Sequence, residues 1–259
     1  MSAGLIAATF LLAVVVAVRS TWSPCGLSML STVTPLAERG RGHRYGVTAT
    51  WFILGGILGG ATLGLVTALG ALGVDALDLS MTTVGAATAI AAATALASDT
   101  HLFGFALPTH TRQVDDAWLP KYRAWVYGAG FGWQIGVGLA TYIMTAGVYL
   151  MIVLSMLTGD ALLAFVIPTM FGTIRGLSVL LGARIHQPAD LMAFHRKFDA
   201  IGPHVRQAVL GTLAGLVVLG AANVSPWLAL ATALVIAAAA GVASIRNGSG
   251  SRRRRIVAA

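Results

Sequence analysis

Charge is scarce in this sequence. Only 10% of the 259 residues are charged and 57% are hydrophobic, whereas a soluble domain carries roughly 25% charged residues. The mean hydropathy of the chain is +0.81. This composition excludes a soluble globular protein. It predicts an all-α, polytopic integral membrane protein with the lipid bilayer as its surroundings.

Cysteine is scarcer still, because Cys25 is the only one. A single cysteine excludes an internal disulfide framework and a cysteine-based zinc site. The sequence also has no phosphate-binding loop, no Ser/His/Asp set and no paired carboxylates. Its six histidines fall in predicted loops without the spacing of a chelating group. We therefore expect no metal and no cofactor, and whether the protein is an enzyme stays open.

Apolar stretches of about 20 residues, the length that crosses a bilayer, recur along the chain. They form two three-span blocks, residues 1–98 and 124–222, joined by a cytoplasmic loop at 99–123 and followed by an extra span with a basic tail at 223–259. We expect the second block to be inverted relative to the first, as in many transport folds. The seven candidate spans are residues 4–36, 47–72, 81–98, 124–157, 161–183, 207–222 and 226–245.

Basic residues gather in alternate loops, and such residues mark the cytoplasmic side. This predicts a cell-membrane protein with its N-terminus outside and its C-terminus in the cytoplasm. Residues 2–18 contain no Lys or Arg, so we expect a span there rather than a signal peptide. The basic tail favours anionic lipid over nucleic acid as a contact. The residues concerned are Arg39, Arg41 and Arg44 against Glu38 in loop 37–46, Arg196, Lys197 and Arg206 in loop 184–206, and Arg246 and Arg252 to Arg255.

The segment Ser23-Pro24-Cys25-Gly26 interrupts the first span. This span is too long for one straight crossing at 1.5 Å per residue. Ser is a favoured N-cap and Pro is favoured at the first helical position, so we expect a second half-helix to begin here. Cys25 would lie in its first turn, where the helix dipole favours a thiolate. The alternative is a kinked helix in which Cys25 is a small buried apolar residue.

Arg19 and Arg175 are the only charged residues inside the predicted spans. A buried arginine costs at least about 2.5 kcal/mol and usually faces a cavity or a partner. No carboxylate falls within a span, so the remaining partners are backbone carbonyls, water or an anion. The alternative is that both side chains reach an interface. Glycines spaced by four residues predict close helix packing, at Gly55, Gly59, then Gly56, Gly60, Gly64, and Gly128, Gly132, Gly136.

The two blocks align weakly, with Trp22 on Trp133 and Cys25 on Gly136. Together with the Ser-Pro-Cys segment and the Gly-rich spans, this resembles the CcdA family and the membrane domain of DsbD, over about residues 4–222. The resemblance implies electron transfer from cytoplasmic thioredoxin through one cysteine in each block. Here Cys25 matches the first of these cysteines, and Gly136 stands where the second is expected.

Three functions follow as hypotheses. The resemblance implies a thiol-redox protein in which Cys25 is catalytic and acts with the cysteine of a thioredoxin-like partner. The residues alone suggest a transporter of a small solute, with Arg19, Arg175 and the Ser23-Pro24-Gly26 break lining its site, and with Trp133 and Gly136 at the equivalent position. The third hypothesis is a non-catalytic membrane subunit, for which the glycine ridges are sufficient.

Overall fold

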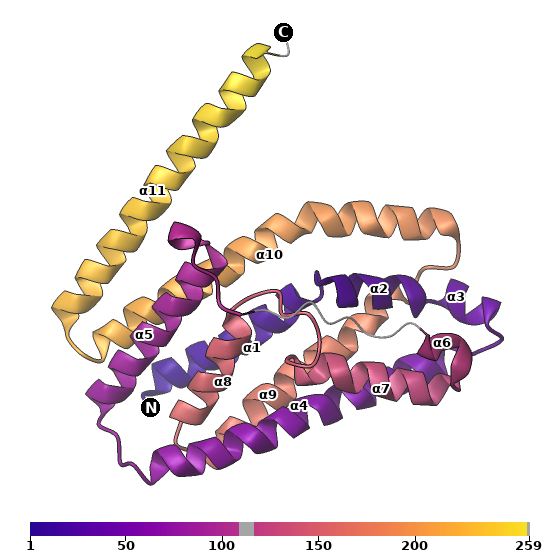
Figure 1. Ribbon diagram of the computed structural model, residues 1–259, viewed down its shortest axis with the longest axis horizontal. Helices are drawn as coiled ribbons and strands as arrows, with labels where there is room; N and C mark the ends of the chain where they lie inside the picture. The colour runs from indigo at the N-terminus through magenta and orange to yellow at the C-terminus, as the bar shows by residue number, and fades with distance from the viewer. Residues whose placement is uncertain (109–116, 258–259) are drawn as a thin grey trace.

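The computed structural model describes the backbone of residues 1–108 and 117–257, and the side chains of residues 1–108 and 117–241 (Figure 1). The described secondary structure is helical. The helices are α1 (Ala3–Ser20), α2 (Pro24–Thr32), α3 (Pro35–Gly40), α4 (Tyr45–Asp75), α5 (Met81–Asp99), η1 (Leu102–Gly104), α6 (Trp118–Lys121), α7 (Ala124–Val137), α8 (Gly147–Leu157), α9 (Ala161–Leu177), η2 (Ser178–Gly182), α10 (Pro188–Ala222) and α11 (Pro226–Val257).

Five of the described helices are long and apolar enough to cross a membrane. They are α1, α4, α5, α9 with η2, and α10. Two shorter apolar helices accompany them, Gly147–Leu157 and Pro226–Gly241. The structure thus agrees with an all-helical membrane protein. The seven-span count, the inversion of the second block and the orientation in the membrane stay predictions.

The structure corrects the extent of several predicted spans. The stretch 4–36 is divided into α1, α2 and the start of α3. The stretch 124–157 is also divided, because Gly138 has a φ of 75° and ends α7. The stretch 184–206, predicted as a loop, is largely helical. Pro188 begins α10, and Gln187 and Asp190 cap its first turn reciprocally; this local signal was present in the sequence.

Helix α4 is the centre of the bundle and packs against both α7 and α9. The predicted close packing of glycines is confirmed. A Cβ at Gly55 would overlap the carbonyl oxygen of Ala129 in α7, and one at Gly132 would overlap that of Phe52 in α4. On another face of α4, Gly56 and Gly60 meet Gly172 in the same way. Because these glycines have no side chains, the backbones of α7 and α9 each come into direct contact with the backbone of α4.

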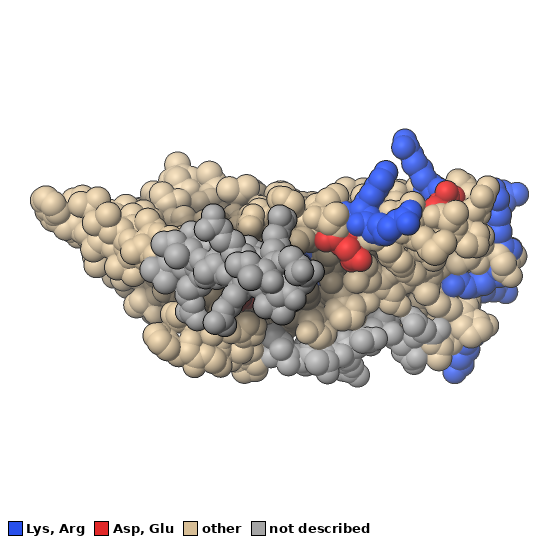
Figure 2. Space-filling model, turned by 90° about the horizontal axis from the view of Figure 1, so that it is seen from above, with Lys and Arg blue, Asp and Glu red and all other residues tan. Residues whose placement is uncertain are grey.

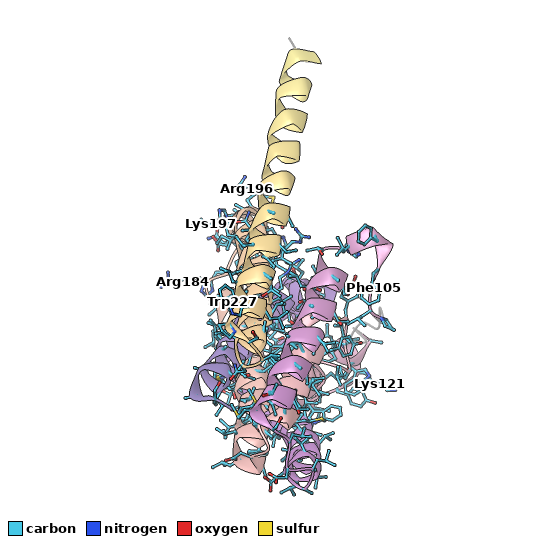
Figure 3. All side chains as sticks on the ribbon, turned by 90° about the vertical axis from the view of Figure 1, so that its left-hand side faces the viewer. Phe105, Lys121, Arg184, Arg196, Lys197 and Trp227 are labelled. Carbon is cyan, nitrogen blue, oxygen red and sulfur yellow. The ribbon has the colours of Figure 1, made fainter. Side chains whose placement is uncertain are left out.

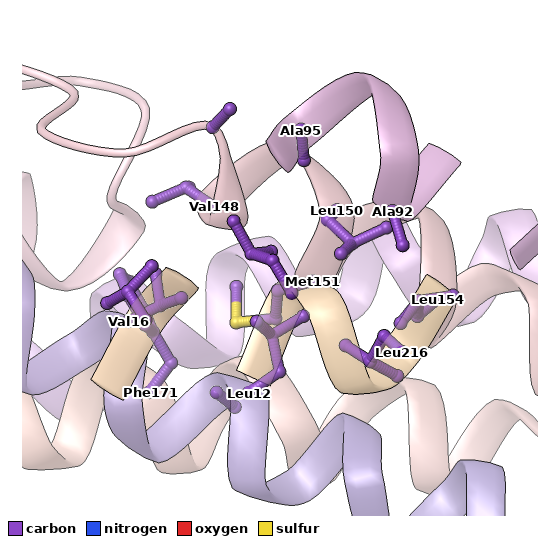
Figure 4. Packing of buried hydrophobic residues seen from close by; sticks show 14 of the residues in the cluster. Leu12, Val16, Ala92, Ala95, Val148, Leu150, Met151, Leu154, Phe171 and Leu216 are labelled. Atoms are coloured by element: carbon purple, nitrogen blue, oxygen red, sulfur yellow. The ribbon is translucent and has the colours of Figure 1, made fainter. Parts of the chain in front are cut away.

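The main apolar core lies between α1, α8, α9 and α10 (Figure 4). Leu12, Val16, Met151, Phe171 and Leu216 are each at most 1% exposed. The outer faces of the spans carry exposed leucines, such as Leu58 and Leu69 of α4, as expected of helices that face lipid. On the face shown in Figure 2, Lys and Arg gather toward one end, and the visible atoms of the opposite end are uncharged.

Helix α11 contacts α10 and projects away from the remaining helices (Figure 1). Trp227 at its start is 79% exposed. Figure 3 labels Trp227 near the start of this helix. The side chains of Arg246 and Arg252 to Arg255, which support the predicted cytoplasmic tail, lie outside the described residues, as does part of the predicted loop 99–123.

Candidate functional site at the break between α1 and α2

The break predicted at Pro24 is confirmed. Helix α1 ends at Ser20, and α2 begins at Pro24 after three non-helical residues. Ser23 is extended, and its Oγ accepts a hydrogen bond from the N–H of Gly26 at 3.1 Å. The local cause is the one read from the sequence, a Ser cap followed by Pro, which lacks the N–H that would continue α1.

Arg175 reaches this break from the last turn of α9. Its side chain is only 2% exposed, and its Nη2 atom has no hydrogen-bond partner among the described residues. The guanidinium carbon lies 5.6 Å from the ring centroid of Phe171, which gives a cation–π contact. This contact replaces little of the lost hydration, because a buried charge normally requires both a counter-charge and hydrogen bonds.

A small cavity adjoins the guanidinium. Its volume is about 10 Å³, which is about the space that one water molecule requires. Gly26 allows the backbone to approach itself closely at the break, because a Cβ at this position would overlap the carbonyl oxygen of Thr21. The cavity is lined by Thr21, Gly26, Met29, Leu30, Phe52, Ile135, Arg175, Ser178 and Val179.

Cys25 is 1% exposed and packs with Met29, Val33 and Phe52 in a second apolar cluster. It is near enough to Arg175 for an electrostatic interaction. The structure therefore places Cys25 and Gly26 near Arg175, in the helical turn that begins at Pro24. The catalytic role given to Cys25 is not tested by these contacts and stays a prediction.

Three other predicted site residues lie elsewhere. Arg19 is half-buried and lines a different pocket, together with Asp99 and Arg206. Trp133 is 42% exposed, and its Nε1 donates to the hydroxyl of Thr62 at 3.1 Å. Gly136 is a packing residue: a Cβ there would overlap the carbonyl oxygen of Gly56.

Glu38, read from the sequence only as a loop charge among arginines, is a fully buried carboxylate near the start of α4. Its Oε1 accepts from Arg41 at 2.6 Å, and its Oε2 accepts from the hydroxyls of Thr48 and Tyr127, each at 2.7 Å. His43 lies 3.7 Å from Oε2. Its position as the sole acid in a basic loop was the one available signal, and nothing in the local pattern reveals its burial.

Curated proteins that are similar to this chain share one name, methylamine utilization protein MauF. The chain is 31% identical to MauF of Paracoccus denitrificans over 63% of its own length and 59% of that protein. It is 30% identical to MauF of Methylobacillus flagellatus over 62% of its length and 57% of that protein. It is 32% identical to MauF of Methylorubrum extorquens over 56% of its length and 53% of that protein. The chain thus spans between 53% and 59% of these three relatives.

No family model and no solved structure matches the chain. The interpretation as a CcdA-type thiol–disulfide carrier is wrong, because the similar curated proteins are named for methylamine utilization. The physical reason agrees with this correction: a dithiol relay requires two sulfurs, and the chain contains one. The expected thioredoxin-like partner depended on that resemblance alone.

Proposed function

We propose that this chain is an integral membrane protein that acts in the utilization of methylamine. The single observation that carries the proposal is that five similar curated proteins share the name methylamine utilization protein. The five apolar helices of spanning length support a role in the membrane. The matched region covers the larger part of this chain in each case.

We propose further that this function depends on Arg175 and the break beside it. A buried cation whose Nη2 has no hydrogen-bond partner among the described residues costs stability. Perturbed or unsatisfied charges of this kind cluster at functional sites. The adjoining cavity has room for one water molecule or a similarly small ion next to the guanidinium.

The finer architecture belongs to the same proposal. We place seven crossings in the membrane, with α7 and α8 sharing one of them and α11 as the last, the N-terminus outside and the C-terminus in the cytoplasm. The broken spans at the start of both blocks support an internal repeat. Fusions of a reporter that is active on one side of the membrane, made at each end of the chain, test the orientation. Two ends on the same side would contradict it.

The test of the function is deletion of the gene in its own organism. Growth is compared on methylamine and on ammonium as sole nitrogen sources, with the intact gene restored on a plasmid. We expect growth on methylamine to be lost, growth on ammonium to be unchanged, and the plasmid to restore the loss. Unchanged growth of the deletion strain on methylamine would refute the proposal, as would an organism unable to use methylamine with the gene intact.

A further inference from the structure

A second pocket lies where α1 and α5 end. Its volume is about 280 Å³, far larger than the cavity at Arg175. Arg19 comes from the last turn of α1, Asp99 is the last residue of α5, and Arg206 comes from α10. Tyr142 and Thr145 line it from the segment between α7 and α8. The pocket therefore joins four parts of the chain that are far apart in sequence.

Among the described residues, the only carboxylate that lines the pocket is Asp99, and it already accepts two hydrogen bonds. Oδ1 of Asp99 accepts the N–H of Ala146 at 2.7 Å, and Oδ2 accepts the hydroxyl of Thr145. Ala146 is the N-cap residue of α8, so Asp99 satisfies a donor at the start of that helix, where a negative charge is favourable. Asp99 thus has a structural task, which explains why a carboxylate is present at this point.

Arg19 and Arg206 form no ion pair with a described carboxylate. Arg19 interacts electrostatically with both Arg206 and Asp99. Arg206 donates from Nη2 to the backbone carbonyl of Asp99 at 3.2 Å. Among the described side chains, no carboxylate lies within 4.0 Å of either guanidinium, and the ion pairs found involve Glu38 instead. Two like charges that share one pocket repel each other unless an anion lies between them.

We propose that this pocket binds an oxyanion, a phosphate or carboxylate group held by Arg19 and Arg206. Guanidinium groups match the geometry of both anions and bind them through paired N–H donors. The pocket lies at the ends of two apolar spans, so the oxyanion comes either from a lipid headgroup or from a small dissolved molecule. A cationic amine is excluded, because it would meet two positive charges and an already engaged carboxylate. This inference does not depend on the proposed function.

Two binding experiments on the purified full chain distinguish the sources. In the first, inorganic phosphate and acetate are titrated against the thermal unfolding midpoint in a neutral detergent, at constant ionic strength, with methylammonium chloride as the cationic probe. In the second, the protein is reconstituted in phosphatidylcholine nanodiscs with or without phosphatidylglycerol, and retained lipid is counted by native mass spectrometry. The variants are Arg19→Gln, Arg206→Gln and the matched control Arg196→Gln, an exposed arginine of the same helix outside the pocket.

We expect saturable stabilisation by phosphate or acetate, or retention of phosphatidylglycerol, and none by methylammonium. Binding should weaken about tenfold in Arg206→Gln, the effect of losing one charge-assisted contact, and stay unchanged in Arg196→Gln. Because Arg206 is exposed, its variant should fold normally, and its unfolding midpoint without ligand checks this. The absence of both effects in the wild-type protein, or equal binding by Arg206→Gln and Arg196→Gln, would overturn the proposal.

Discussion

Among the side chains that the structure describes, two charged ones are buried, Glu38 near the start of α4 and Arg175 in the last turn of α9. Glu38 accepts hydrogen bonds from Arg41, Thr48 and Tyr127. Arg175 has the ring of Phe171 beside it and an Nη2 atom without a partner in the described structure. Both charges are removed from water. The protein compensates the charge of Glu38 with hydrogen bonds, and it leaves one nitrogen of Arg175 without a hydrogen bond in the described structure.

Under the function proposed above, this difference separates a structural charge, Glu38, from a functional one, Arg175. A buried ion whose bonding capacity is met by the protein holds elements together, and removal of one partner is costly because the others lose their acceptor. A buried ion that the protein leaves partly unsatisfied requires a further group to complete it. We therefore expect changes at Glu38 to act on stability, and changes at Arg175 to act on function.

The largest effect on stability should come from Glu38→Ala. It removes the carboxylate to which Arg41, Thr48 and Tyr127 donate. Loss of one member of a buried ion pair costs roughly 3–5 kcal/mol, and we expect the lower end of this range because Arg41 still donates to the backbone carbonyl of Thr32. We expect a large fall in the thermal unfolding midpoint of the purified protein. Tyr127→Phe removes one of the same hydrogen bonds and should cost about 1 kcal/mol. Equal midpoints for Glu38→Ala and the wild type would remove the distinction between the two charges.

Gly26→Ala should have the next largest effect. The added Cβ would overlap the backbone of Thr21 at the break, and overpacking of this kind costs about 1–3 kcal/mol. Because Gly26 lines the cavity at Arg175, growth on methylamine should fall as well. Gly4→Ala is the matched control, since a Cβ at Gly4 has nothing within 4 Å. If both variants behave alike, the geometry of the break has no role.

Cys25→Ser should have a smaller effect on stability. Its side chain packs in an apolar cluster, and exchange of a thiol for a hydroxyl in such a site costs about 1–2 kcal/mol. We expect growth on methylamine to persist, since a relay of electrons needs a second sulfur. Loss of growth with normal amounts of protein in the membrane would instead establish the catalytic role predicted for Cys25.

Part of this comparison could be read from the sequence. Pro24 after a serine predicted the break. Arg175 in an apolar stretch without carboxylates left two alternatives, a buried cation or a side chain that reaches an interface, and the structure shows the first. The glycine spacing in α4 and α7 predicted a close crossing. These signals are local: a helix cap, a charge in an apolar span and residues without side chains. Each can be recognised from a few neighbouring residues.

The contacts of Glu38 and Arg19 could not be read in this way. Glu38 depends on Tyr127, 89 residues away, and Arg19 shares a pocket with Asp99 and Arg206. The second break, after Gly138, was missed because the apolar run continues through it. Contacts between residues so far apart in sequence depend on how whole helices pack together. The spacing of residues along a single span does not predict that packing.

The central claim is that Arg175 serves function rather than stability, and Arg175→Met tests it most directly. Methionine has a similar shape and no charge, and apolar replacement of a buried charge is often neutral or stabilising. The variant is examined in the membrane fraction of a strain that lacks the chromosomal copy, with its amount, its unfolding midpoint and growth on methylamine measured together. We predict an unfolding midpoint equal to or above that of the wild type and loss of growth. A lowered midpoint with growth retained in proportion to the remaining folded protein would contradict the account.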